Sequence, residues 1–443
     1  MKKSFTWRKL FNDIHLWLGI ASGFVLFIVC LSGTIYTFRT EVEEFLEPDK
    51  YRVETTENAQ VLPPDALIAK LEKELKGKVV SLDIPQDKKS TYRFGVAQQA
   101  AGGEGHSERG NREEAKGENR AETAGNHTAP EAGGKEAKGS IAQGGPQAER
   151  GGHGGGPGGS RPKTYLVDPY TGIVKGTTDS PASEFFMTMM QLHRWLLIEG
   201  GVGKMIVGIA TIIFVFLLLT GLVIWFPVKL KNWKQGLKIK TNANWKRINH
   251  DLHNTLGFYS FLLLLIMSLT GLCWSFEWYR NGVSAIMGDE VFKGRREKPL
   301  PSNPPGADAL HLTTVDFIQR ANTLLPYAGN IKVSLPADSV SSVVVSKTKA
   351  GFFALSAPDK VQLDQYTGQP LKVEIFAEKP LNEQIVALIR PLHLGDVYGT
   401  FSKILYFIAC LIATSLPVTG TLIWINKLKK KSKKARAKKS IVA

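Results

Sequence analysis

Five of the nine histidines in this chain lie at the ends of strongly apolar segments. His15 and His253 precede two segments that match each other in sequence, and His193 and His393 precede the other two. One histidine at a membrane boundary often only extends toward the headgroups. Four histidines in two matched pairs instead favour metal ligation, because a polar side chain at membrane depth is costly. Two imidazoles facing across a helix bundle can hold the iron of one haem.

The two pairs are predicted to lie at opposite faces of a membrane. His15 with His253 would hold an inner haem b, and His193 with His393 an outer one. Electrons could then cross the roughly 30 Å hydrocarbon core. His250 lies one turn before His253 and could replace it as the inner ligand, and only the internal repeat favours His253.

Two arginines adjoin the outer pair. Arg194 follows His193 directly, and Arg390 precedes His393 by one turn. A guanidinium can bind a haem propionate. It can equally anchor a helix at the membrane interface, and both interpretations stay open.

Several other chemistries lack their motifs. No Gly-x-Gly-x-x-Gly follows a predicted strand, and there is no phosphate-binding Gly-rich loop with Lys-Ser/Thr, so no nucleotide-binding domain is expected. Cys-x-x-Cys-His, His-Glu-x-x-His and Ser/His/Asp arrangements are also missing, which leaves hydrolysis without support. Cys30, Cys273 and Cys410 lie inside apolar segments and are expected to be packing residues. An unknown electron donor must therefore come from the inner membrane or the cytoplasm.

Four uncharged apolar segments could position the histidines. They run from Leu16 to Phe38, from Met205 to Phe226, from Asn254 to Phe276 and from Ile404 to Ile425. Each has about the 20 residues that a helix needs to cross a bilayer. The first is too long for the apolar part of a secretory signal and has no cleavage site, so we expect an uncleaved helix.

The basic residues predict the orientation of these helices. The chain of 443 residues has a net charge of +16, and three stretches without acidic residues hold much of it: 1–10, 227–247 and 427–439. Such flanks stay in the cytoplasm, so both termini are predicted to be cytoplasmic and loops 39–204 and 277–403 to face outward. Contact with anionic lipid explains the basic tail, and no nucleic-acid partner is expected.

An internal repeat relates the two halves of the chain. The His15-to-Gly33 stretch matches the His253-to-Gly271 stretch, and the glycine follows the histidine by 18 positions in both. Thr-Gly-Leu-Val-Ile-Trp at 220–225 likewise matches Thr-Gly-Thr-Leu-Ile-Trp at 419–424. Because matched segments cross in the same direction, we expect two parallel repeats related by an axis along the bilayer normal.

Each outer loop is predicted to form a small α+β unit. An amphipathic helix at 66–75 or 315–325 precedes alternating strands within 79–97 or 331–346. Leu-Val-Asp-Pro-Tyr-Thr-Gly, which ends at Gly172, has a counterpart in the second loop and is typical of a turn between strands.

Residues 98–162 are rich in Gly, Ala, Glu and Lys, with few large apolar side chains. Such a segment cannot bury enough surface to order itself, so we expect a disordered insertion. His106, His127 and His153 lie within it without the spacing of a metal cluster.

The predicted organisation is a membrane protein with a four-helix transmembrane bundle and two small periplasmic α+β domains. Its parts are residues 1–38 (N-terminus and first span), 39–97 with 163–182 (first outer domain), 98–162 (insertion), 183–226 (juxtamembrane helix and second span), 227–252 (basic loop), 253–278 (third span), 279–380 (second outer domain), 381–426 (juxtamembrane helix and fourth span) and 427–443 (basic tail).

These motifs together resemble the PepSY-associated transmembrane family, whose members are often described as iron-regulated or iron-uptake membrane proteins. The similarity covers most of the chain. It rests on the two His-x-x-x-Gly motifs, Leu-His-Arg-Trp at 192–195, the Asp-Pro-Tyr-Thr-Gly turn and the two Thr-Gly-x-x-Ile-Trp motifs. The insertion at 98–162 departs from the family pattern.

The resemblance implies PepSY-type outer domains, bis-histidine haems and, for some members, reduction of ferric siderophores in the periplasm. We therefore expect a haem-containing reductase of the bacterial inner membrane that passes electrons to a ferric complex. The alternative is a non-redox, membrane-anchored PepSY protein that binds or regulates a peptidase. A transporter has less support, because no apolar segment carries a charge in its middle.

Overall fold

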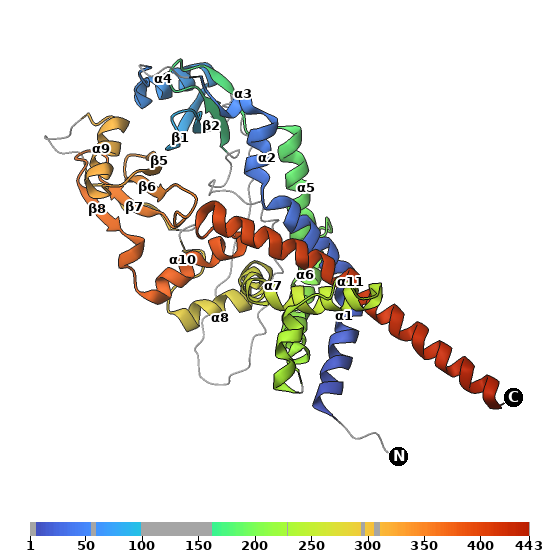
Figure 1. Cartoon of the computed structure of the whole chain (residues 1–443). Helices are drawn as coiled ribbons and strands as arrows, with labels where there is room; N and C mark the ends of the chain where they lie inside the picture. Colours follow the sequence, from blue (N-terminus) through green and yellow to red (C-terminus); the bar gives the residue numbers. More distant parts are fainter. Residues whose placement is uncertain are drawn as a thin grey trace, which may run out of the picture.

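The computed structural model describes residues 6–54, 59–98, 162–227, 229–293, 297–304 and 311–442. Four long helices form a bundle (Figure 1): α1 (Trp7–Tyr36), α6 (Val202–Trp225), α7 (Trp245–Ser275) and α11 (Gly399–Val442). Each contains an apolar stretch long enough to cross a membrane. The predicted membrane protein with four apolar helices is confirmed at this level.

Two of these helices begin well before their apolar segments. α1 begins at Trp7 and α7 at Trp245, where the Asn244 side chain accepts a hydrogen bond from the Arg247 backbone N–H at 3.1 Å. A helix can continue beyond the hydrocarbon core once its polar side chains reach the headgroups. His15 and His253 therefore lie about two turns inside their helices, rather than at the helix starts.

The bundle has a diagonal arrangement. α1 packs against α6 and α11, and α7 packs against the same two helices. α1 and α7 therefore face each other across the bundle. We call the end that carries Trp7 and Trp245 the basic end, and the opposite end, which adjoins the β-sheet, the sheet end.

Two shorter helices bring histidines to the sheet end. α5 (Pro181–Trp195) packs on α1 and α6, and α10 (Leu381–Leu394) packs on α7. α5 starts with a capping box formed by Ser180 and Ser183. α10 ends at Gly395, whose φ of 80° is the left-handed conformation that glycine adopts most easily. α5 ends at Trp195 and α10 at Leu394, so each helix stops less than one turn after its histidine.

Shorter helical segments connect the bundle to the sheet and close the basic end. They are α2 (Arg39–Leu46), α3 (Pro48–Tyr51), α8 (Glu277–Met287) and the 3-10 helices η1 (Leu230–Leu237) and η3 (Phe376–Glu378). At the basic end the Arg8 guanidinium donates hydrogen bonds to the carbonyls of Ile224 and Phe226, both at 2.7 Å. These carbonyls belong to the last turn of α6 and its cap, which lack helical N–H partners.

One antiparallel sheet of eight strands lies beyond the sheet end (Figure 1). The spatial order is β4-β3-β2-β1-β5-β6-β7-β8, so strands of the first loop occupy one half and strands of the second loop the other. The strands are β1 (Gly77–Ile84), β2 (Tyr92–Gln98), β3 (Lys163–Val167), β4 (Val174–Thr177), β5 (Gly329–Ser334), β6 (Val343–Lys349), β7 (Asp359–Leu363) and β8 (Pro370–Glu374).

The two predicted α+β units join through β1 and β5. Leu82 of β1 pairs with Val333 of β5, and both side chains are fully buried. Helices α4 (Pro64–Leu75) and α9 (Thr314–Leu324) contribute Leu67 and Phe317 to the same apolar core. The units therefore share one sheet and one core, which the sequence patterns did not predict.

The predicted turns between strands are present. Gly172 and Gly368 have φ values of 68° and 67°, which lie in the left-handed region. In each turn an aspartate Oδ1 accepts the backbone N–H two residues later, at 2.9 Å, for Asp168 as for Asp364. The predicted disordered insertion at 98–162, with its three histidines, lies outside the described residues apart from Gln98 and Pro162.

Candidate functional site

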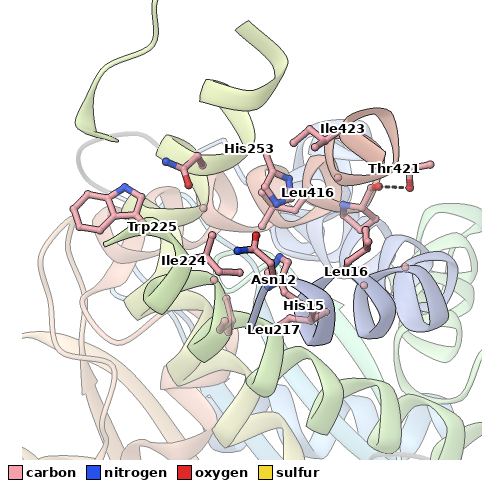
Figure 2. A pocket seen from close by; sticks show the side chains of 18 of the residues that line it. Asn12, His15, Leu16, Leu217, Ile224, Trp225, His253, Leu416, Thr421 and Ile423 are labelled. Carbon is pink, nitrogen blue, oxygen red and sulfur yellow. Dashed lines mark hydrogen bonds between the residues drawn. The ribbon is translucent and has the colours of Figure 1, made fainter. Parts of the chain in front are cut away.

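His15 of α1 and His253 of α7 face each other across the bundle near the basic end. Their ring centroids are 6.3 Å apart and the ring planes are nearly perpendicular, at 89°. Both rings line a cavity of about 220 Å³ whose walls come from α1, α6, α7 and α11, and Figure 2 shows both side chains in it. The structure thus brings together two residues that are 238 positions apart in the sequence.

Threonine hydroxyls orient these two rings. Nδ1 of His15 lies 3.0 Å from Oγ1 of Thr220, and Nδ1 of His253 lies 2.9 Å from Oγ1 of Thr419. Each hydroxyl donates its own proton to the carbonyl four residues earlier in its helix, at 2.7 Å and 3.0 Å. A hydroxyl that donates to this carbonyl accepts from the ring, and the arrangement favours the tautomer with the proton on Nδ1 and a free lone pair on Nε2.

His193 of α5 and His393 of α10 form a second pair near the sheet end. Their ring centroids are 6.0 Å apart, and the planes are tilted by 52°. Nδ1 of His193 lies 2.8 Å from the carbonyl oxygen of Val29, and Nδ1 of His393 lies 2.9 Å from that of Met267. A carbonyl can only accept, so Nδ1 again carries the proton and Nε2 is free.

A glycine of a neighbouring helix makes room for each ring. A Cβ on Gly33 would come within 2.9 Å of Nδ1 of His193, and one on Gly271 within 2.9 Å of Cε1 of His393. For the inner pair, Cβ atoms on Gly221 and Gly420 would come within 3.3 Å and 3.2 Å of the rings of His15 and His253. The glycines of the two matched His-to-Gly stretches and of the two Thr-Gly-x-x-Ile-Trp motifs therefore contact the imidazole rings.

His250 and His253 differ in their surroundings. His250 lines the same cavity, but its side chain is 55% exposed and its Nδ1 lies 3.5 Å from Oδ1 of Asp251. His253 is the residue that faces His15 and is oriented by a threonine. Polar groups of the largely apolar cavity wall come from His250 and also from Asn12, Asn254, Thr421 and Lys427.

The two arginines predicted to adjoin the outer pair lie on its helices. The Arg194 guanidinium is 5.4 Å from the ring centroid of Trp195, a cation–π contact. Arg390 is exposed on α10. Burial raises the pKa of the nearby Asp396 carboxyl, and the charge of Arg390 opposes that rise.

Some contacts of the site were not predicted. Thr220 and Thr419 stood in the recognised Thr-Gly-x-x-Ile-Trp motifs, yet the pattern gave no reason to assign them a partner. Trp274 also contacts the outer pair, because its ring centroid lies 5.1 Å from that of His393. Its position three residues after Gly271, one helical turn beyond an imidazole contact, is the signal that could have identified it.

Within the described ranges, no group of three or more His, Cys, Asp and Glu side chains is arranged to hold a metal ion. A family model described as the PepSY-associated TM region matches residues 13–427. The chain belongs to this family. The PepSY-associated TM match includes both histidine pairs, their threonine and carbonyl partners, and the whole sheet. No curated protein matches the chain.

Proposed function

We propose that this PepSY-associated TM protein is a membrane oxidoreductase in which each histidine pair holds one b-type haem. The observation that carries the proposal is the common state of the four rings. Each has Nδ1 in a hydrogen bond and Nε2 free, and the rings occur as two facing pairs. Metal-ligating histidines usually donate their other ring N–H to an oxygen in this way.

The spacing of the rings fits one iron between each pair. A metal–imidazole bond of about 2 Å, plus about 1 Å from the ligating nitrogen to its ring centroid, separates two opposed centroids by about 6 Å. The observed separations are 6.3 Å and 6.0 Å. Gly19, Gly23 and Gly257 line the inner cavity, and they leave backbone rather than side chains facing a flat ligand.

A bound haem would accept and release single electrons as its iron changes between Fe(III) and Fe(II). The protein's own part is to hold each ring in place through Nδ1 and to surround the inner site with apolar side chains such as Phe214, Leu217 and Phe261. Lys427 also lines the cavity, and its ammonium group would be available to pair with a haem propionate.

The proposed direction of electron flow follows from charge. Basic flanks favour the cytoplasm, so the basic end would face inward and the sheet would lie in the periplasm of a bacterial inner membrane. Electrons would pass from a donor in the cytoplasm or the membrane pool, through the inner and outer haems, to a ferric complex such as a ferric siderophore near the sheet. In this proposal the two halves are parallel repeats, each supplying one histidine to each haem.

The decisive experiment is to purify the protein in detergent and to quantify haem by absorption, oxidised and dithionite-reduced. We expect about two b-type haems per chain, and about one after His15→Ala, His253→Ala, His193→Ala or His393→Ala. His250→Ala is the matched control and should keep both. A correctly folded, haem-free wild-type protein would contradict the proposal and would support the non-redox PepSY alternative.

Electron paramagnetic resonance would assign the two sites. Nearly perpendicular imidazole planes leave two iron d orbitals close in energy and increase the anisotropy of the low-spin ferric signal. With planes at 89° and 52°, the inner site should give the more anisotropic signal. His15→Ala should remove that component, and His193→Ala the other. Reduction of a ferric siderophore by pre-reduced protein in vesicles then tests the activity itself.

A further inference from the structure

Four aromatic side chains form an exposed patch where the sheet meets α11, and we call them the aromatic patch. Phe352 and Phe353 are 51% and 65% exposed, and Tyr398 and Phe401 are 54% and 39% exposed. The Phe353 ring centroid lies 4.8 Å from those of both Phe352 and Phe401. Large aromatic side chains left together on a surface indicate a binding surface, because burying them is strongly favourable.

The patch is fixed to the start of α11 by backbone contacts. The Phe401 backbone N–H donates to the Phe352 carbonyl at 3.1 Å, and Leu355 forms a β-bridge with Tyr398. Gly399 has a φ of 55°, and a Cβ there would come within 2.5 Å of the Gly351 carbonyl oxygen. The loop after β6 and the first turn of α11 are therefore in close contact, although about fifty residues separate them.

The patch continues an exposed apolar stripe on α11. Phe401 is followed at helical spacing by Ile404, Leu405, Ile408 and Leu411, all exposed in the isolated chain. These residues lie in the membrane-crossing part of the helix, so lipid is the medium that covers them. Phe353 contacts Phe401 at the top of this stripe.

The depth of the patch fits the boundary of a bilayer. From Phe401 to Ile425, the end of the apolar segment, a helix rises about 36 Å. The hydrocarbon core is about 30 Å thick. Phe401, and the rings packed on it, therefore lie where the hydrocarbon meets the headgroups of the sheet-end leaflet. Aromatic side chains concentrate in this zone.

We infer that the aromatic patch inserts into the sheet-end leaflet, so that lipid binds a loop of the β-sheet layer directly. Because the sheet is continuous from β4 to β8, one inserted loop positions the whole layer above the bundle. This inference does not depend on haem or on redox activity.

Spin labels in lipid nanodiscs test the inference in the full-length chain. A nitroxide is attached at Phe353→Cys and, in a second variant, at Tyr398→Cys. Val340→Cys is the matched control, since Val340 is 55% exposed in a loop of the same sheet that the patch does not include. Wild-type protein treated with the reagent measures background labelling of Cys30, Cys273 and Cys410.

The measured quantity is the ratio of collisions with lipid-soluble oxygen to collisions with a water-soluble nickel chelate. We expect this ratio at positions 353 and 398 to be several times the ratio at position 340. Equal ratios at all three positions would overturn the inference and would leave the patch to a protein or a soluble ligand. Two labelled positions keep the test valid should one substitution disturb the loop.

Discussion

Each of the four candidate ligand histidines has one occupied and one free ring nitrogen. At the residue scale the nearest partner of Nδ1 is a threonine hydroxyl at the basic end and a backbone carbonyl at the sheet end, where Thr270 Oγ1 also lies 3.4 Å from Nδ1 of His393. The threonine hydroxyls can be removed by substitution, whereas the carbonyls cannot. The two sites therefore need different experiments.

The threonine contacts predict that substitution of either threonine weakens haem binding at the inner site only. Thr220→Val or Thr419→Val keeps the shape of the side chain and removes the acceptor for Nδ1. Loss of such a partner lowers metal-site affinity about 10–100-fold. Haem titration of the apoprotein should show this loss for one site only. Thr211→Val is the control, since its hydroxyl bonds only to its own helix, and an equal effect there would refute a histidine-orienting role.

The glycine contacts predict the opposite selectivity. Gly33→Ala or Gly271→Ala places a methyl group within 2.9 Å of an outer imidazole, so the ring must move and the outer haem should be lost while the inner haem remains. Haem quantification with paramagnetic resonance separates the two. Gly282→Ala, where nothing lies within 4 Å, should leave both haems in place. An unchanged outer signal in Gly33→Ala and Gly271→Ala would disprove the close approach.

At the element scale, α1 and α7 each serve both sites. α1 carries His15 near one end and the Val29 carbonyl with Gly33 near the other, and α7 repeats this arrangement. The 18 residues from His15 to Gly33 correspond to about 27 Å along a helix. Because this spacing is equal in both halves, the two histidines of each pair lie at the same level along the bundle.

The helices over the sheet are also linked to each other. Oδ1 of Asp65 in α4 accepts hydrogen bonds from the backbone N–H and the hydroxyl of Thr314, at 2.8 Å and 2.7 Å. Thr314 is the first residue of α9, so Asp65 satisfies a free N–H of another helix. This contact joins the two α+β units on the helix-covered face of the sheet.

Asp65→Ala should therefore destabilise the sheet layer by about 1–2 kcal/mol, the usual effect of losing a helix cap. Thermal unfolding of the purified protein measures the change, and hydrogen exchange should show faster opening at the start of α9. Asp65→Asn retains an acceptor oxygen and should recover most of the stability. Equal loss in both variants would show that the carboxylate acts in another way.

At the scale of the whole molecule, neither half is complete. Each histidine pair takes one ring from each half, and β1 and β5 join the halves in the middle of one sheet over one core. Separating the halves would expose both strand edges and much of that core, which disfavours independent folding.

We therefore predict that a chain divided in the basic loop after Pro227 functions only when both pieces are produced together. Co-expressed pieces should copurify with about the haem content of the intact protein. Either piece alone should bind no bis-histidine haem and should aggregate. A reduced haem spectrum from one piece alone would show that the pairs are not formed between halves.

The sequence by itself determined the parts of this protein that depend on local composition and spacing. Apolar length defined the four helices, and the His-to-Gly repeat selected His15, His253, His193 and His393. The same motifs indicated the family that the comparison confirmed. The ends of the helices were predicted less well. An apolar run marks the part of a helix inside the hydrocarbon core, and helical hydrogen bonding can continue beyond it.

Only the tertiary structure decided how these parts meet. It placed α1 and α7 on a diagonal, turned His253 toward His15, gave each ring of the two pairs a hydrogen-bond partner and joined two predicted units into one sheet. These contacts link residues up to about 250 positions apart. They depend on which helix faces and strand edges pack together, and periodicity within one segment carries no information about its partner.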